Sequence, residues 1–363
     1  MRRRLGAACF LISAVVLGFA GAWEVGNSSR SEAAGATSNV ATTTASFTAL
    51  QEGDLVVAGS SDGQNGLWVL ARDSVRSTMR AYHFGGALGS RRIDLSLTDA
   101  GRLGSIAVTR DGLVWAGAGQ RLVAFDPLTG LIRTAMDLPP AQRAVARAQR
   151  TPDGTTLGLG QITAIAGSAT GIWIARYAAP ELIFIDATFA AKRVALPADV
   201  DVAQLATVDG QVWFTTNFGT DERLGSVIGR IDEPASVTFI ATPAESLAVA
   251  SSGLHALGQL WRELDGKSGQ TIAARPLPRQ PIDVAAVAVD NNGQLIARGA
   301  RQAQLHVFDR NGSEVRSIGY VAGSFMSRGR MYASTAPLAF LVVGRDGTIW
   351  FGSQSGSVVY KAA

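Results

Sequence analysis

The sequence has few of the residues on which most catalytic sites and disulfide-bonded folds depend. Its 363 residues include one cysteine, Cys9, and three histidines, His83, His255 and His306. Because Cys9 lies in an apolar N-terminal run, the folded part has no disulfide, no thiol nucleophile and no cysteine metal ligand. None of the histidines has a second histidine or a glutamate at the spacing of metal ligands. The sequence therefore predicts no metal and no cofactor.

Charged residues are also scarce, at 17% of the chain, although the isoelectric point is about 9.6. Residues 1–22 hold three of the 33 basic residues and none of the 29 acidic ones, so the rest carries 30 basic and 29 acidic residues. A nearly neutral protein has no electrostatic attraction for nucleic acid, which is therefore not predicted as a partner. A hydrophobic content of 47% excludes a globally disordered chain.

The N-terminal segment has the composition of an export signal. Arg2, Arg3 and Arg4 precede the uncharged run 5–19, and Ala20-Gly21-Ala22 has the small residues of a cleavage site. The apolar run up to Trp23 is about 19 residues long, close to what a membrane-spanning helix needs. Residues 1–22 are predicted to be a signal peptide or an N-terminal membrane anchor. If this segment is not cleaved, it is the chain's only predicted membrane contact. The protein is then periplasmic, secreted or anchored to the outer face of the cytoplasmic membrane.

Residues 23–45 contain mostly small polar side chains without apolar periodicity, which is typical of a flexible tether. The folded domain is predicted to begin at residue 46 and to continue to residue 363.

The folded domain repeats one pattern of short strands and tight turns. Its clearest copy has an apolar strand at 105–108, an Asp111-Gly112 turn, a strand containing Trp115, and a further strand that ends at Asp126. Asp-Gly supplies the positive φ of a hairpin turn. The tryptophan fills the space between neighbouring sheets, and the period of two distinguishes strands from helices.

The repeat predicts a single all-β propeller of seven blades. The copies are marked by Trp68, Trp115, Trp173, Trp213, Trp261, Leu295 and Trp350. Trp68 and Trp350 are 282 residues apart, so the six steps between them average 47 residues, as expected for four-stranded blades. The alternative is six blades, with the Trp261 region as an insertion. The last copy has only three strands before Ala363, so an N-terminal strand near 47–50 is expected to close the ring.

Three segments interrupt or decorate this repeat and provide the candidate binding residues. Residues 139–160 place Arg143, Arg147 and Arg150 at helical spacing, which predicts a surface helix. Its basic stripe either is simply solvated or docks an acidic partner or a lipid surface. Residues 320–337 form a second long connection, and long connections in compact folds are often functional. Its candidates are Arg328, Arg330 and Tyr332. The third segment is the charged cluster Asp221, Glu222 and Arg223 in a predicted loop of the Trp213 blade.

The blade motifs resemble those of the streptogramin B (virginiamycin B) lyase propellers. Val212-Trp213-Phe214-Thr215 after Asp209-Gly210 is similar to a lyase blade, and the segment 346–352 is also similar to blades of two-component-regulator propellers. The resemblance implies the fold. It does not carry over the lyase chemistry, because Thr216 stands where the family has a metal-binding glutamate and no histidine matches the family's base.

These observations predict an exported, non-catalytic binding, scaffolding or sensing module in the bacterial cell envelope, whose partner is a protein or a small molecule. The alternative is a divergent lyase- or lactonase-type enzyme that acts on a small cyclic ester and uses carboxylates such as Asp221 or Glu222.

Overall fold

The structure is a computed structural model in which all regular secondary structure of the described residues is β-strand, and none of them belongs to a helix that could cross a membrane. The described residues are 40–98, 103–145, 148, 158–216, 227–232, 236–250, 253–279, 281–299, 303–320, 324–327, 330–333, 338–354 and 356–363.

The first four blades are antiparallel sheets of four strands each. Blade 1 has β3 (Asp54–Ser61), β4 (Gly66–Asp73), β5 (Thr78–Gly85) and β6 (Arg91–Thr98). Blade 2 has β7 (Gly104–Val108), β8 (Val114–Ala118), β9 (Arg121–Phe125) and β10 (Ile132–Asp137). Blade 3 has β11 (Ile162–Gly167), β12 (Gly171–Arg176), β13 (Glu181–Asp186) and β14 (Ala191–Ala195). Blade 4 has β15 (Val202–Val208), β16 (Gln211–Thr216), β17 (Val227–Asp232) and β18 (Ser236–Pro243).

The last three blades include strands from both ends of the folded unit. Blade 5 has β19 (Ser246–Ala250), β20 (Gly253–Leu257), β21 (Leu260–Leu264) and β22 (Thr271–Pro276). Blade 6 has β23 (Ile282–Val289), β24 (Leu295–Gly299), β25 (Gln304–Phe308), β26 (Glu314–Gly319) and β1 (Ala41–Thr44). Blade 7 has β29 (Leu338–Val343), β30 (Ile349–Ser353), β31 (Val358–Ala362) and β2 (Ser46–Ala49). A separate hairpin contains β27 (Ser324–Ser327) and β28 (Arg330–Ala333).

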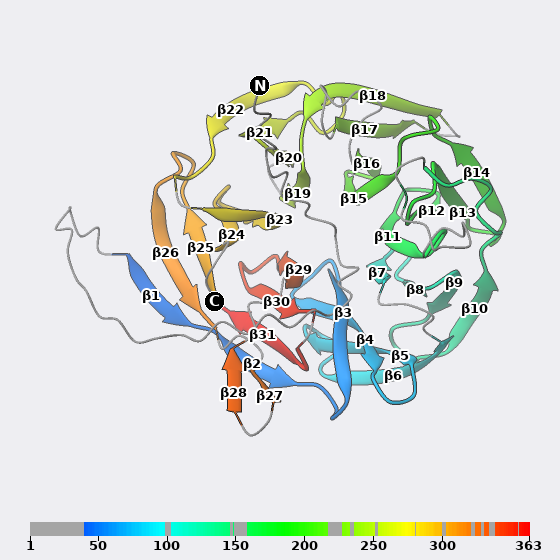
Figure 1. The fold of residues 1–363 in the computed structure, drawn as a ribbon, viewed down its shortest axis with the longest axis horizontal. Helices are drawn as coiled ribbons and strands as arrows, with labels where there is room; N and C mark the ends of the chain where they lie inside the picture. The colour runs from blue at the N-terminus through cyan, green and yellow to red at the C-terminus, as the bar shows by residue number, and fades with distance from the viewer. Residues whose placement is uncertain are drawn as a thin grey trace, which may run out of the picture. The chain divides into compact units, whose positions relative to one another are not determined.

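The seven sheets stand around a common centre, with the first strand of each blade innermost (Figure 1). The prediction of an all-β propeller with seven blades is therefore confirmed, and the six-blade alternative is wrong. The Trp261 region is not an insertion, because it supplies two strands of blade 5.

An N-terminal strand closes the ring, as predicted. β2 pairs with β31 in antiparallel register, from Ser46 opposite Lys361 to Ala49 opposite Val358. The structure also shows a closure that was not predicted, because β1 adds a fifth strand to blade 6 by parallel pairing with β26. Residues 41–44, assigned from the sequence to the flexible tether, thus form a strand. All four of its residues are exposed, so no apolar pattern marks it.

Each contact between neighbouring blades has its own hydrophobic cluster, and six of the seven clusters contain one tryptophan among the described residues. Trp68 packs edge-on against Phe125 of blade 2, with ring centroids 5.3 Å apart. Trp173 lies in the cluster that blades 3 and 4 share, and Trp213 in the cluster of blades 4 and 5. The predicted role of the tryptophans as fillers between blades is confirmed.

Two of the seven repeat markers were placed on the wrong residue. Trp261 lies on β21, the third strand of blade 5, and His255 occupies the equivalent position on β20. In blade 6 that position is held by Ile296 rather than Leu295, because Gly293 precedes Ile296 by three residues, as Gly210 precedes Trp213. The space between blades can therefore be filled from an adjacent strand of the same blade.

Successive strands of a blade run in opposite directions, as in a β-meander, so the connections between strands lie alternately at the two ends of the ring. Connections that follow the first and third strands of a blade are two to six residues long, and we call their side the turn end. Connections after the second and fourth strands lie at the opposite side, the loop end, and include the three longest, 138–161, 217–226 and 320–337. Short turns fix one end of the ring, and chain length varies at the other.

The pairing of β2 with β31 predicts a measurable loss of stability on truncation. A chain that begins at Gln51 lacks both N-terminal strands and leaves a sheet edge exposed in blade 7. We expect its free energy of unfolding to fall by about 3 kcal/mol or more relative to a chain that begins at Val40, since at least four backbone pairs are lost. Urea unfolding followed by tryptophan fluorescence measures the difference.

A third chain that begins at Ala45 retains β2 and lacks only β1, so it separates the two closures. Equal stability of the chains that begin at Val40 and Gln51 would contradict closure by β2.

Candidate functional site

The meander brings all three candidate segments to one end of the ring. The described strands that flank the segments 139–160, 217–226 and 320–337 all end or begin at the loop end. Arg147, Arg150, Asp221, Glu222, Arg223 and Arg328 lie outside the described residues. Arg330 and Tyr332 belong to β28, where their backbones pair with Ser327 and Phe325.

Arg143 is the one candidate whose side chain the structure describes, and it is exposed. The surface helix predicted for 139–160 is absent from the described part 139–145. Two of its backbone groups pair with blade 3. The Val145 N–H donates to the carbonyl oxygen of Ala178 over 2.9 Å, and the carbonyl oxygen of Pro139 accepts from Arg176 over 2.6 Å.

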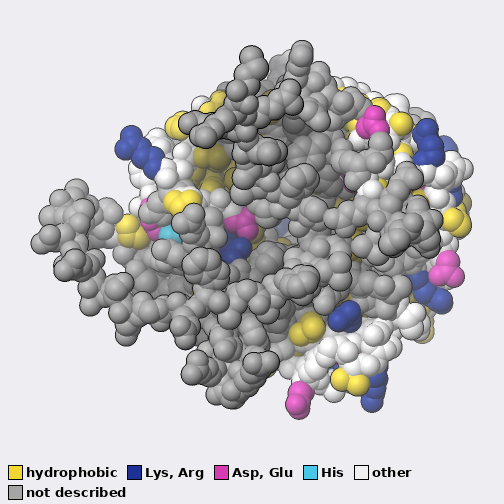
Figure 2. Space-filling view, viewed as in Figure 1, with side chains coloured by type: hydrophobic (Ala, Val, Ile, Leu, Met, Phe, Trp, Pro, Cys, Tyr) yellow, Lys and Arg dark blue, Asp and Glu magenta, His cyan; other side chains and the backbone are white. Residues whose placement is uncertain are grey.

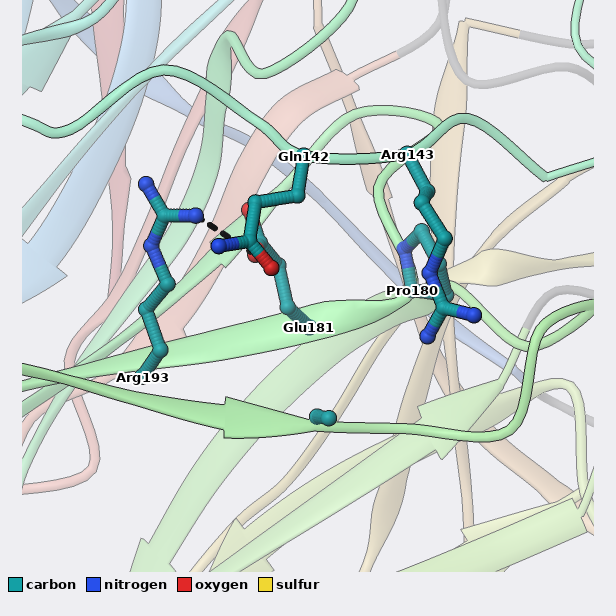
Figure 3. Close-up of a pocket in the computed structure, with 6 residues that line it drawn as sticks. Gln142, Arg143, Pro180, Glu181 and Arg193 are labelled. Atoms are coloured by element: carbon teal, nitrogen blue, oxygen red, sulfur yellow. Dashed lines mark ion pairs between the residues drawn. The ribbon is translucent and has the colours of Figure 1, made fainter.

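Arg143 borders a small pocket at the loop end of blade 3, the Arg143 pocket, which Gln142, Arg143, Pro180, Glu181, Arg193 and Ala195 line (Figure 3). Its volume is about 30 Å³, which is the size of a single water molecule. The pocket can thus receive one small group, such as the end of a side chain, and is too small to enclose a free ligand.

One buried carboxylate faces several arginines in this pocket. Glu181 forms an ion pair with Arg176, whose side chain is completely buried, and a longer one of 3.9 Å with Arg193. Burial and the charge of Arg193 lower the pKa of Arg176 to about 10, so its guanidinium remains protonated at neutral pH. The Nη2 of Arg193 also donates to the carbonyl oxygen of Pro140 over 2.6 Å.

Arg143 lies on the other side of Glu181 from Arg193 in the view of Figure 3, and its guanidinium has no ion-pair partner among the described residues. Three arginines thus surround one glutamate, so the pocket has an excess of positive charge at its exposed edge. An anionic group such as a carboxylate or a phosphate fits this arrangement.

Arg176, Glu181 and Arg193 were not among the residues predicted from the sequence. Arg176 is the last residue of β12, and Glu181 is the first residue of β13. In the sequence they can be recognised only as two charged residues next to apolar strands.

The inner strands carry few groups that could perform chemistry in the centre of the ring. Asp54 and Asp283 are the only acidic residues on β3, β7, β11, β15, β19, β23 and β29, which contain no histidine. Asp54 is fully buried and pairs with Arg80. Asp283 pairs with Arg298 over 3.0 Å, and both side chains are buried. These carboxylates therefore stabilise buried arginines.

All three histidines belong to the packing of the blades. His83 is fully buried, with Nδ1 2.7 Å from the carbonyl oxygen of Gly89 and Nε2 3.2 Å from the carboxylate of Asp62. His306 lies within β25, and its Nδ1 is 2.7 Å from the carboxylate of Glu314.

His255 occupies the position that a tryptophan has in most blades. Its Nδ1 accepts a hydrogen bond of 3.2 Å from the Trp261 indole, and only 1% of the residue is exposed. Burial lowers the pKa of His255 to about 4, so the ring is neutral at pH 7.

Thr216, which replaces the glutamate of the lyase motif, is buried at the end of β16. Its hydroxyl accepts a hydrogen bond of 3.1 Å from the N–H of Val227, the first residue of β17. The residue thus holds together the two strands that the 217–226 connection joins.

Charged side chains of both signs are scattered around the rim on the face shown in Figure 2, without one large patch of a single sign among the described residues in view. This distribution agrees with the nearly neutral composition.

The fold is that of several solved propellers, although no family model matches the sequence and no curated protein is similar to it. Virginiamycin B lyase from Staphylococcus aureus has a TM-score of 0.60 and 15% identity, over 87% of this chain and 98% of the lyase. A catalytically inactive histidine-to-alanine variant of that lyase, with quinupristin, has a TM-score of 0.58 and 16% identity, over 87% and 98% of the two chains.

The extracellular domain of BT4673 from B. thetaiotaomicron, a putative one-component system, has a TM-score of 0.52 and 12% identity. The match covers 87% of this chain and 40% of that one. At these identities the similarities show the propeller fold, and the predicted resemblance to lyase and sensor propellers is confirmed at that level.

The burial of His255 predicts a pH dependence of stability. Between pH 6.5 and about 4 the unfolded chain binds a proton at this residue that the folded protein does not bind, so stability decreases as the pH falls through this range. The decrease from this residue reaches about 3 kcal/mol near pH 4. Urea unfolding of the wild type and of His255→Gln, between pH 7 and pH 4, measures it. Parallel curves for the two proteins would contradict the assignment.

The arrangement of the Arg143 pocket predicts that two substitutions change the free energy of unfolding by very different amounts. Glu181→Gln leaves the buried Arg176 guanidinium without its carboxylate and should reduce the free energy of unfolding by about 3 to 5 kcal/mol. Arg143→Ala removes an exposed side chain and should change it by less than about 0.5 kcal/mol. Chemical unfolding at pH 7 tests both, and equal effects would show that Arg143 is part of the ion-pair cluster.

Proposed function

We propose that this chain is an exported, non-catalytic β-propeller of the bacterial cell envelope that binds a protein partner at its loop end. It serves there as a scaffold or as a sensing module. The observation that carries the proposal is that the reactive side chains are already engaged. Every histidine and every inner-strand carboxylate takes part in a contact within its own blade.

A hydrolytic or lyase reaction needs a general base that can reach the substrate. His83, His255 and His306 are all less than 10% exposed, and their ring nitrogens have protein partners. In the Staphylococcus aureus lyase, by contrast, the replacement of one histidine by alanine gives a catalytically inactive protein. The comparison favours binding over catalysis for this chain.

The loop end is the side best suited to bind a partner. It carries the three longest connections, whereas the turn end has connections of two to six residues. The Arg143 pocket adds a local anchor there, because Arg143 has no ion-pair partner in the described part of the chain and the small volume suits a single carboxylate of an acidic protein segment.

Export and an envelope location rest on the N-terminal segment 1–22 and gain support from the extracellular position of the BT4673 propeller. The same neighbour supports a sensing role, since that domain is the extracellular domain of a putative one-component system.

Affinity capture from the native host tests the proposal. The protein carries a C-terminal tag, cells are crosslinked gently, envelope and cytoplasmic fractions are separated, and captured proteins are identified by mass spectrometry. We expect one partner in stoichiometric amount from the envelope fraction, reduced at least tenfold by Arg143→Glu.

Arg110→Glu is the matched control, because Arg110 is an exposed arginine at the turn end of blade 2. Recovery from the cytoplasm alone, or turnover of a small cyclic ester by the purified protein, would overturn the proposal. Capture that is equally reduced by both substitutions would contradict the assignment of the loop end.

A further inference from the structure

The connection from blade 2 to blade 3 is much longer than the ring requires. It spans residues 138–161, between β10 and β11. The equivalent connections between four other pairs of neighbouring blades have two to six residues: 99–103, 196–201, 244–245 and 277–281. Of the long connection the structure describes residue 148 and two stems, 138–145 and 158–161, and we call the two stems the loop neck. Because other blades are joined without such a neck, it is not needed to join two blades.

Both stems of the loop neck are fastened to the same connection of blade 3, the one that follows β12. In the first stem, the Val145 N–H donates to the carbonyl oxygen of Ala178 over 2.9 Å. In the second stem, the Gly160 N–H donates over 3.0 Å to the carbonyl oxygen of Tyr177. The N–H of Tyr177 in turn donates over 2.7 Å to the carbonyl oxygen of Gln161. Backbone hydrogen bonds at both ends thus hold the loop at one place on the ring.

The two stems also contact each other, and the neck buries apolar side chains. Val145 is 1% exposed, and Leu138 is likewise buried. The N–H of Leu138 donates over 2.8 Å to the carbonyl oxygen of Gln120, which fastens the first stem to blade 2. Gly160 has a φ of 78°, and a Cβ added there would lie 3.2 Å from the Cβ of Ala141 in the other stem. The neck is therefore closed and packed, as are the bases of Ω-loops.

Arg143 lies between two fastened points of the neck. On one side, the carbonyl oxygen of Pro140 accepts from Arg193 over 2.6 Å, and on the other side Val145 pairs with blade 3. Pro139 and Pro140 also have a fixed φ. The backbone of Arg143 is thus held in place before a partner arrives. A binding residue that is ordered beforehand loses less conformational entropy when the partner binds.

We propose that Val145 and Gly160 are positioning residues of the loop-end site. They hold the neck closed, and the closed neck places Arg143 for the carboxylate of an acidic protein segment. This inference rests on the proposed function and adds to it the residues that preorganise its anchor. Neither residue carries a charge or lines the Arg143 pocket, so a change in binding that follows their substitution reports the position of Arg143.

Hydrogen exchange and affinity capture, both with the full-length protein, test the role of Val145. The probe for capture is the envelope protein that the wild type recovers in stoichiometric amount. Val145→Asp places a carboxylate at a buried position, so the first stem should leave blade 3. We expect the Gly160 N–H to exchange at least tenfold faster and recovery of the probe to fall at least fivefold. Val75→Asp is the matched control, because Val75 is 86% exposed in another loop-end connection, and both quantities should stay within twofold of the wild type.

Gly160→Ala is the second variant and tests the neck from its other stem without adding a charge. Its methyl group lies against Ala141, so the Val145 N–H should exchange at least threefold faster and recovery of the probe should fall at least twofold. Gly119→Ala is the matched control, since Gly119 also has a positive φ, 58°, and an added Cβ there meets nothing within 4 Å. Addition of Ala141→Gly to Gly160→Ala removes the facing methyl group and should restore both quantities to the values of Gly119→Ala.

Two results would overturn the positioning role alone. Unchanged exchange in Val145→Asp and Gly160→Ala would show that these residues do not hold the neck. Faster exchange with unchanged recovery of the probe would show that a closed neck does not position Arg143. If the wild type recovers no envelope protein, the proposed function itself fails and the positioning role with it, so the two failures are distinguishable.

Discussion

The pairing of β2 with β31 is the interaction on which the rest of the ring depends. It joins residues 46–49 to 358–361, so the two ends of the folded unit share one sheet. Each blade packs only on its two neighbours. Without the pairing of β2 with β31, blade 7 would lack its outer strand. Because the closing strand comes from the opposite end of the sequence, blade 7 is complete only when the whole chain is present. The parallel strand β1 extends the same tie to blade 6.

Much of the fold could be predicted because each blade repeats the same physical solution. Glycine before a strand and a tryptophan within it mark the inter-blade contact, and the missing strand of blade 7 indicated the closure. The errors have a common cause. His255 and Ile296 fill the volume that tryptophan fills elsewhere, and Trp261 reaches its interface from the next strand. Sequence spacing does not distinguish two strands of one hairpin when either can fill the gap. β1 lacked a signal altogether, because every residue in it is exposed.

The candidate site was predictable only in part, and topology explains which part. The lengths and charges of the three segments could be read from the sequence. Their common end could not, because it follows from the strand order: each segment comes after the second or the fourth strand of its blade. The residues that line its pocket with Arg143 were not predictable, since Glu181 and Arg193 reach this pocket from β13 and β14. A buried ion pair across two strands depends on register, which a repeat pattern does not specify.

Because the blades repeat, the turn of one blade can be compared with the equivalent turns of the others. Most turns at the turn end are closed by an aspartate that accepts N–H groups of its own turn. Asp126 illustrates the strength of this arrangement, because hydrogen bonds led by the one from the Thr129 N–H lower its pKa to about 2. The first turn of blade 4 departs from this rule, because it has only two residues, Asp209 and Gly210, and both have positive φ. Its backbone geometry closes the hairpin without the help of the aspartate side chain. The same short connection between two strands is thus made in two physical ways within one ring.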